Sequence, residues 1–202
     1  MTATAIILLL RTHRLRVFTT ADFLTLTDLA PDAATHALER LRRQDLLAKL
    51  KKGLWINRVG ASVNPYEAVP YLRTPWPAYV SLYSALADYG VVEEIPQVVY
   101  AVTAASPKRY KTPIGEFRIH HLPARLMWGY EMRGAGESRY PMAEREKAFL
   151  DLSYLALTPR SPLELPQKRG RRWDLDPAKL RDYAERFSFK PLETWLKRER
   201  LA

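Results

Sequence analysis

Residues Pro31 to Arg43 constrain the fold most, because their apolar positions repeat at the spacing of a single α-helix. Pro31 suits the first helical turn, where its missing N–H would have no partner in any case. At about 100° per residue, one side of this helix collects Ala34, Ala37, Leu38 and Leu41. We expect that side to pack against the rest of the chain and the other side to face solvent.

The solvent side of this predicted helix carries side chains that suit the reading of DNA bases. Arginine forms bidentate pairs with guanine, glutamate accepts from the cytosine amine, and threonine or histidine supplies adaptable hydrogen bonds. The candidate DNA-binding residues here are Thr35, His36, Glu39, Arg40, Arg42 and Arg43. An ordinary solvated helix face would carry the same residue types, so the helix alone leaves both interpretations open.

The segment that follows favours DNA binding, because it predicts a β-hairpin with a cationic tip. Strand-like runs at 46–50 and 54–57 flank Lys51-Lys52-Gly53, where glycine supplies the positive φ of a tight turn. The candidate DNA contacts of the hairpin are Lys49, Lys51 and Lys52. Between His36 and Arg58, seven Lys or Arg residues stand against two acidic residues, a surplus that suits phosphate contact. We expect these cations to converge on one exposed surface.

Two shorter helices are predicted before this one. Residues 3–13 form the first, and Thr19 with Asp22 three residues later indicates a capping box for the second. Three helices and a hairpin are the contents of a winged helix-turn-helix, which lays one helix in the major groove and rests a β-ribbon on the backbone. We therefore assign residues 1–62 to such a DNA-binding domain. The alternative is a winged helix that serves as an adaptor for protein partners.

Composition narrows the class of partner and the compartment. The 202-residue chain has a formal net charge of +10, which favours a polyanion such as DNA, although RNA or a membrane surface would satisfy charge alone. The absence of Cys excludes disulfides and thiolate metal sites and fits a reducing cytoplasm. The apolar run from Ala5 to Leu10 is too short for an export signal or a membrane span. We expect a cytoplasmic protein with no membrane partner.

Beyond Asn57 the composition changes, and we place a domain boundary at about residues 60–66. Regular structure is interrupted there by Pro65, Pro70, Pro75 and Pro77. Residues 66–202 predict a second domain of the α+β class, with a mostly antiparallel sheet and packed helices. Its predicted helices span 77–89, 143–155, 176–186 and 190–200, and its predicted strands span 97–103, 109–112, 117–122, 127–132 and 138–142.

The segment from Thr158 to Arg172 is rich in proline and basic residues. It ends in Lys168-Arg169-Gly170-Arg171-Arg172, which suits either a solvated loop or a basic arm on the DNA backbone or minor groove. We favour the solvated loop.

The sequence carries no recognisable catalytic constellation. It lacks the acidic-x-Lys triplet of restriction-type nucleases, the Gly-Ser dipeptide of nucleotidyltransferases and a phosphate-binding loop before Lys-Ser or Lys-Thr. His120 and His121 are adjacent in a predicted strand and point to opposite faces, which argues against a zinc site. The remaining acid–base candidates are Glu144, Glu146, Lys147 and Asp151, and ion pairing on an exposed helix face explains them more simply.

We therefore predict no catalytic residue, no metal and no cofactor. An enzyme that modifies nucleic acid or another protein, with the winged helix as its targeting device, remains the alternative function.

Four stretches of the second half form a combination of known type. They are Ala78 to Gly90 (AYVSLYSALADYG), Ile95-Pro96, Tyr100 to Thr103 (YAVT) and Glu146 to Leu152 (EKAFLDL). This combination resembles AbiEi-type antitoxins, which belong to bacterial abortive-infection (type IV) toxin–antitoxin systems. The resemblance covers most of the chain, because that family also opens with a winged helix.

The resemblance implies two activities. The winged helix would bind inverted repeats upstream of its own operon and repress transcription. The second domain would counter a cognate AbiEii-type nucleotidyltransferase toxin without forming a stable complex with it. Residues of the antitoxic activity are undefined in that family, so no catalytic residue is carried over. The family positions are matched by Ser81, Ser84, Tyr89 and Lys147, for which the residues themselves predict packing or capping roles.

Overall fold

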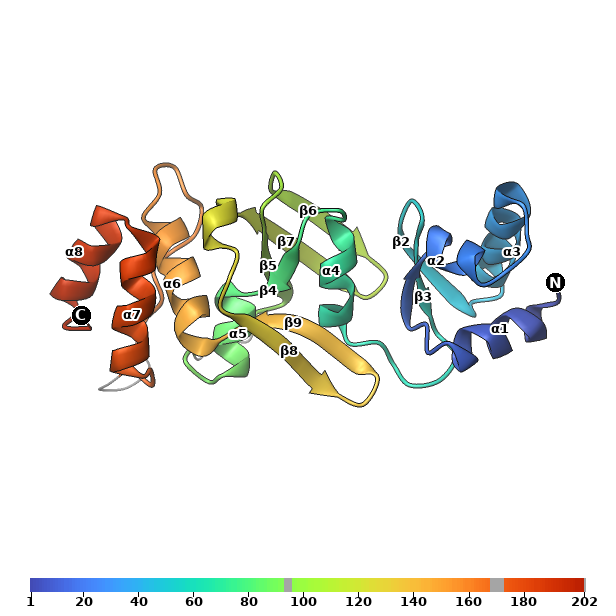
Figure 1. Cartoon of the computed structure of the whole chain (residues 1–202), viewed down its shortest axis with the longest axis horizontal. Helices are drawn as coiled ribbons and strands as arrows, with labels where there is room; N and C mark the ends of the chain where they lie inside the picture. The colour runs from blue at the N-terminus through green and yellow to red at the C-terminus, as the bar shows by residue number, and fades with distance from the viewer. Residues whose placement is uncertain (93–95, 168–172, 202) are drawn as a thin grey trace.

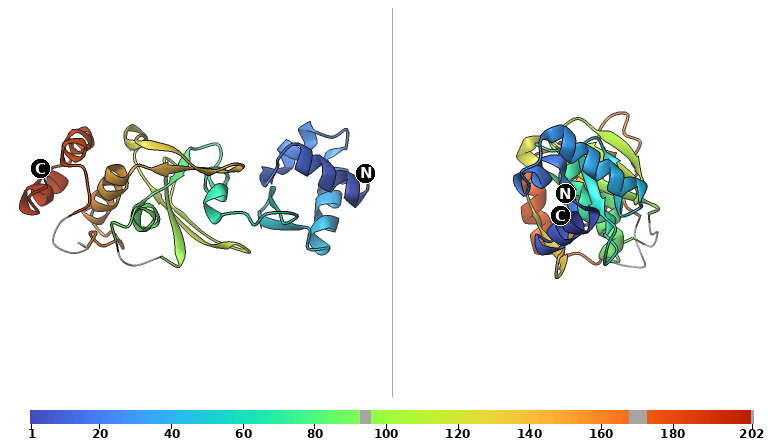
Figure 2. Two further views of the ribbon diagram at one scale, coloured as in Figure 1. Left: turned by 90° about the horizontal axis from the view of Figure 1, so that it is seen from below. Right: turned by 90° about the vertical axis from the view of Figure 1, so that its right-hand side faces the viewer.

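The structure, a computed structural model, describes residues 1–92, 96–167 and 173–201. The predicted basic run 168–172 and Ile95 of the family resemblance lie outside the described residues. The molecule is elongated, with an N-terminal unit at one end and the last helices of the chain at the other (Figure 1, Figure 2).

The N-terminal unit, residues 1–57, places its elements in the order helix, strand, helix, helix, strand, strand. They are α1 (Ala3–Thr12), β1 (Val17–Thr19), α2 (Thr20–Thr25), α3 (Pro31–Arg43), β2 (Leu47–Lys51) and β3 (Leu54–Asn57). The three strands form an antiparallel sheet in the order β1-β3-β2. The helices and the hairpin therefore lie where the sequence predicted them.

Local signals set the ends of these elements. The Thr19 hydroxyl oxygen accepts a hydrogen bond from the Asp22 N–H at 3.0 Å, and the Asp22 carboxylate accepts one from the Thr19 N–H at 2.7 Å. This reciprocal pair is the predicted capping box of α2. Gly53 has a φ of +73°, which permits the two-residue turn between β2 and β3.

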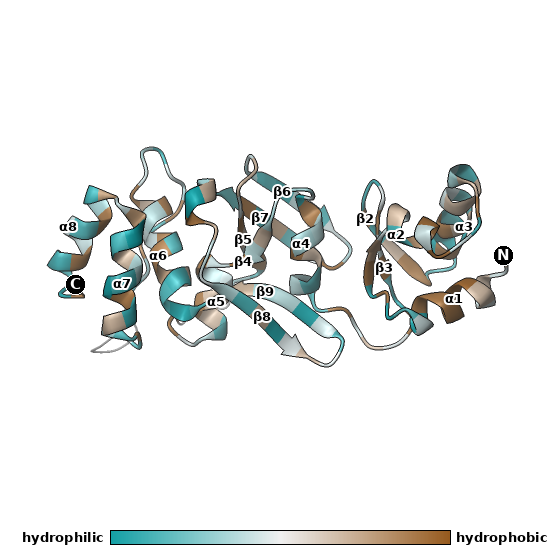
Figure 3. Ribbon diagram, in the orientation of Figure 1, coloured by the Kyte–Doolittle hydropathy of each residue, from teal (hydrophilic) through white to brown (hydrophobic). Residues whose placement is uncertain are grey.

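The small sheet is buried on both faces. Trp55 and Phe18 pack into an apolar cluster with α1, α2 and α3. Leu54 and Ile56, which alternate with Trp55 along β3, belong instead to the apolar cluster of the second unit. The coloured ribbon shows β3 and α1 as largely hydrophobic (Figure 3). Packing, and not only the connecting chain, therefore fixes the N-terminal unit to the rest.

A partly buried ion pair reinforces this junction. The Arg16 Nε lies 2.7 Å from the Glu67 carboxylate, which is also hydrogen-bonded by the Ser138 hydroxyl at 2.9 Å and the Asn64 N–H at 2.8 Å. Burial raises the pKa of Glu67, but these hydrogen bonds outweigh burial, so the pKa stays below its ordinary value. Glu67 lies in η1 (Pro65–Ala68), which leads into α4 (Val69–Leu72).

The second unit is built on a sheet of six strands among the described residues. The strands are β4 (Ala78–Val80), β5 (Val98–Thr103), β6 (Lys108–Thr112), β7 (Gly115–His121), β8 (Tyr130–Ala135) and β9 (Ser138–Ala143). Their order is β6-β7-β5-β4-β9-β8. The β5–β7 and β4–β9 pairs are parallel and the other pairs are antiparallel, so the mixed sheet is mostly antiparallel, as predicted.

Helices pack on this sheet and extend beyond it (Figure 1). They are α5 (Leu82–Asp88), α6 (Arg145–Ala156), α7 (Pro177–Phe187) and α8 (Lys190–Arg198), with a short turn η2 (Ala124–Leu126) before β8. The Asp176 carboxylate caps α7 by accepting from the backbone N–H groups of Ala178 and Lys179. The α+β class and the last three helices agree with the sequence prediction.

The predicted helix from Pro77 to Tyr89 is wrong in its first half. Ala78, Tyr79 and Val80 form β4, and the helix α5 starts only at Leu82. β4 pairs with β5 on one side and with β9 on the other, and all three of its residues are buried. Because tyrosine and valine favour a central strand, this pairing outweighs the helix-starting preference of Pro77.

The sequence prediction of an exposed, ion-paired helix face on α6 is also wrong for three residues, because Glu146, Lys147 and Asp151 are buried. The side chains of Lys147 and Asp151 are fully buried and form an ion pair one turn apart. The Asp151 carboxylate also accepts from the Tyr79 hydroxyl at 3.1 Å and the Ser81 hydroxyl at 2.9 Å. Lys147 donates to the Tyr79 hydroxyl at 2.9 Å. This network connects α6 to β4 and satisfies each of its charged groups.

Burial dominates the electrostatics of the network. It raises the pKa of Asp151, lowers the pKa of Lys147 and raises the pKa of Tyr79 well above its ordinary value. The Lys147 ammonium further lies 5.0 Å from the centre of the Trp128 ring and 5.1 Å from that of Phe187. Both charges are therefore held in an apolar and aromatic surrounding, where each depends on the other.

We expect Lys147→Met to lower the free energy of unfolding by about 3–5 kcal/mol, because it leaves the Asp151 carboxylate buried without a cation. The double variant Lys147→Met/Asp151→Asn, which removes both charges, should recover part of this loss. Urea unfolding followed by circular dichroism measures both. Lys197→Met on the exposed surface of α8 is the control and should change stability by about 0.5 kcal/mol or less. Equal effects of Lys147→Met and Lys197→Met would contradict the prediction.

Candidate nucleic-acid interface

Helix α3 presents a buried side and a polar side, as its sequence predicted. Ala34, Ala37, Leu38 and Leu41 are buried beneath it. The side chains of Thr35, His36, Arg40 and Arg43 are exposed on the other side. Pro31 occupies the first helical position, and α3 follows α2 after a short connection. The α2–α3 pair therefore consists of two helices joined by a short connection, with the polar side of α3 exposed to solvent.

The β2–β3 hairpin is anchored beside α2. The Trp55 Nε1–H donates to the Thr20 hydroxyl at 2.9 Å, and the Thr20 N–H donates to the Gly53 carbonyl at 2.9 Å. These bonds hold the tip of the hairpin against the first turn of α2. Lys52, at the tip, is exposed and makes no hydrogen bond or ion pair with the part of the chain that the structure describes.

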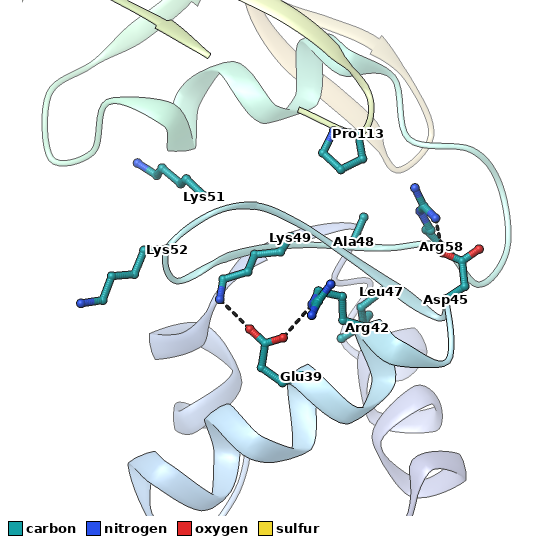
Figure 4. A pocket seen from close by; sticks show the side chains of 10 residues that line it. All are labelled: Glu39, Arg42, Asp45, Leu47, Ala48, Lys49, Lys51, Lys52, Arg58 and Pro113. Atoms are coloured by element: carbon teal, nitrogen blue, oxygen red, sulfur yellow. Dashed lines mark hydrogen bonds and ion pairs between the residues drawn. The ribbon is translucent and has the colours of Figure 1, made fainter. Parts of the chain in front are cut away.

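Glu39 neutralises two of the predicted cations. Its carboxylate lies 2.6 Å from the Lys49 ammonium and 2.6 Å from the Arg42 Nε (Figure 4). The hydrogen bonds from Lys49 and then Arg42 lower the pKa of Glu39 below its ordinary value. All three side chains are partly exposed, so this cluster joins α3 to β2 at the surface.

Lys51 lies on the other face of the hairpin. Its ammonium donates to the Leu72 carbonyl at 2.8 Å and points toward the second unit in Figure 4. Burial lowers the pKa of Lys51, and the nearby charges of Arg73 and Lys108 lower it further. The predicted cations thus do not all converge on one surface, because the second unit covers the face that carries Lys51.

A hollow of about 560 Å³ lies between the hairpin and the turn after β6. Its lining includes Pro113 from that turn and several of the predicted DNA-binding residues (Figure 4). At one side of it, the Arg58 guanidinium forms an ion pair with Asp45. The cations of this hollow are therefore largely paired with protein groups.

The remaining cations of α3 differ in their contacts. Arg40 donates to the Met1 carbonyl at 3.2 Å, which places it near the start of the chain. The Arg43 side chain has no ion pair or hydrogen bond with residues 1–92, 96–167 or 173–201. The exposed Thr35 hydroxyl donates to the Pro31 carbonyl one turn earlier at 3.0 Å, so its oxygen can still accept a hydrogen bond.

No metal site is present among the described residues, where no group of three His, Cys, Asp or Glu side chains could hold an ion. Glu144 and Glu146 are ion-paired with Lys179 of α7, at 3.3 Å and 3.7 Å.

Among the described residues, no helix has both the length and the apolar character needed to cross a bilayer.

Comparison with models of known protein families and with curated proteins gave no match. Candidate functions therefore depend on the geometry of the surface and on the motifs of the chain.

We expect Glu39→Gln to strengthen binding to random double-stranded DNA by several-fold at low salt, because it removes one anion and releases Arg42 and Lys49. Fluorescence anisotropy with a labelled duplex measures the affinity. Glu193→Gln, which removes the same charge on exposed α8 at the opposite end of the molecule, is the control and should have little effect. Unchanged or weaker binding by Glu39→Gln would contradict the prediction.

Proposed function

We propose that this protein is a cytoplasmic, sequence-specific DNA-binding repressor and an antitoxin of a type IV toxin–antitoxin system. The observation that carries the DNA-binding half is the polar side of α3, where Thr35, His36, Arg40 and Arg43 are exposed. These residue types form hydrogen bonds with base edges and phosphates. In this proposal α3 enters the major groove, and Lys52 at the hairpin tip contacts the backbone of the duplex.

The order of elements in the N-terminal unit supports the same assignment. A helix-turn-helix pair followed by a hairpin is the arrangement of a winged helix, in which the ribbon lies beside the helix that reads the groove. The overall charge of +10 favours the approach of a polyanion. The resemblance of residues 78–90 and 146–152 to AbiEi-type antitoxins supports the second half of the proposal.

The ion pairs of Arg42, Lys49 and Arg58 with carboxylates reduce the number of cations that are free to contact phosphates. Of the cations between His36 and Arg58, the exposed ones without a carboxylate partner among the described residues are Arg40, Arg43 and Lys52. Engagement of about three phosphates gives a slope of roughly −3 for log affinity against log salt. Specificity would then come from base contacts of α3, with phosphate contacts fixing its register.

We expect Lys52→Ala to weaken DNA binding and to reduce the steepness of the salt dependence by about 1, because one phosphate contact is lost. Lys51→Ala is the matched control: it removes the same charge one residue away, where the ammonium is bonded to the Leu72 carbonyl, and should leave the slope unchanged. The duplex is the region upstream of the protein's own gene, with a shuffled duplex as reference. Equal affinity for the two duplexes would contradict sequence-specific repression.

We expect the full chain to restore growth when it is produced together with a nucleotidyltransferase toxin of the neighbouring gene. The variant Lys52→Ala should protect equally well, because antitoxic activity is assigned to the second unit and DNA contact to the first. Growth curves with both genes under separate inducers measure protection. Growth arrest in spite of soluble protein would contradict the antitoxin assignment and would leave the DNA-binding proposal standing.

A further inference from the structure

A second cavity, of about 610 Å³, lies on the sheet of the second unit, away from the proposed DNA interface. Its floor comes from β5, β6 and β7, and its walls come from α5, Val92 and the segments 96–98 and 162–167. The polar side chains that line it are Tyr83, Gln97, Tyr100, Arg109, Arg118 and His120, with the exposed Glu164 at its edge. Neither the repressor nor the antitoxin proposal uses this group of residues.

Strand register brings the cations of the cavity together. Arg118 on β7 is directly opposite Arg109 on β6 and Tyr100 on β5, and His120 follows Arg118 on the same face. The alternate residues of β7, Phe117 and Ile119, are buried in the apolar core. The sheet therefore has one apolar face and one face where two guanidinium groups and an imidazole gather.

Polar atoms in this cavity are left without hydrogen bonds. Within the described part of the chain, the buried Nε2 of His120 and the buried Nε of Arg118 have no hydrogen-bond partner. The Arg118 Nε has only an ion-pair contact with Glu116 at 3.6 Å, while its Nη1 donates to the Tyr100 hydroxyl at 3.2 Å. Buried polar atoms are normally paired, and a group bound in the cavity would supply partners for these two atoms.

The positive charges of Arg109 and Arg118 near His120 favour an anionic ligand. Burial, followed by the charges of Arg109 and Arg118, lowers the pKa of His120 to about 4, so its ring is neutral at pH 7. Tyr100 stacks on the ring at 6.0 Å, and Tyr83 lies beyond it, with its hydroxyl donating to the Glu164 carbonyl. Among the described residues, the carboxylates near this ring are Glu116, which is paired with Arg118, and Glu164, which is exposed. A cationic ligand would be repelled by both arginines.

We propose that this cavity binds a phosphomonoester with an aromatic or apolar body, of the size of a nucleoside monophosphate. The dianionic phosphate matches the two guanidinium groups, which suit the bidentate binding of phosphate oxygens, and the His120 ring supplies a further donor when Nε2 carries its proton. The body of the ligand lies against apolar side chains of the wall, such as Val92, Val98 and Leu163. The cavity volume falls in the range of small-molecule sites.

The test is isothermal titration calorimetry of the full-length protein with AMP, GMP, CMP and UMP, and with adenosine and inorganic phosphate as partial ligands. At least one nucleotide should bind about tenfold more tightly than either partial ligand, because it engages both parts of the cavity. The imidazole of His120, followed by NMR, should show a raised pKa in the complex, because the bound phosphate favours the charged ring.

Arg109→Gln should weaken nucleotide binding about tenfold, because one charge-assisted contact is lost. Lys111→Gln is the matched control: it lies on the same strand, is equally exposed, removes the same charge and does not line the cavity. It should change the affinity by about twofold or less. Both variants should bind DNA as the wild type does, so that failure of this proposal is separate from failure of the DNA-binding proposal.

Three outcomes would overturn the proposal. They are no binding by any of the nucleotides, equal losses in Arg109→Gln and Lys111→Gln, and an affinity for inorganic phosphate equal to that of the nucleotides. The second would indicate general charge attraction, and the third would indicate an oxyanion site without a place for the body of a ligand.

Discussion

The burial of β3 on both faces is the constraint on which the rest of the arrangement depends. Trp55 fixes one face of the small sheet to the helices, while Leu54 and Ile56 fix the other face to the second unit. Because each buried aliphatic side chain of this size contributes about 1.5–3 kcal/mol, the two units hold a defined orientation. That orientation decides which cations of the hairpin reach solvent: Lys52 does, and Lys51 bonds to Leu72 instead.

Patterns within one element were predictable from the sequence, and contacts between distant elements were not. The buried side of α3 follows from a period of 3.6 residues, and the cap of α2 follows from Thr19 and Asp22 alone. The direction of Lys51, in contrast, is set by a carbonyl 21 residues away. A count of basic residues between His36 and Arg58 contains no information on that contact.

The same distinction explains the errors in the second unit. α6 is buried on most of its surface, so its apolar residues show no clear helical period. The charged residues Lys147 and Asp151 therefore led to the wrong prediction of an exposed face. The partners that satisfy them, Tyr79 and Ser81, lie about 70 residues earlier. The cavity around His120 could not be predicted from the sequence either. Its residues are brought together by the register of β5, β6 and β7, which is defined only in the folded sheet. Its one visible sign was the run of polar residues at alternate positions of β7.

The packing of α7 and α8 over α6 has a consequence for the order in which the protein is made. Phe149 on α6 stacks on Trp195 of α8 at 5.6 Å, and Tyr154 on α6 lies 5.7 Å from Phe187 of α7. Until α7 and α8 have left the ribosome, the aromatic residues of α6 that they cover are exposed to solvent and accessible to chaperones. The sheet is translated well before the helices that seal its core, so the unit matures only after synthesis has passed α8.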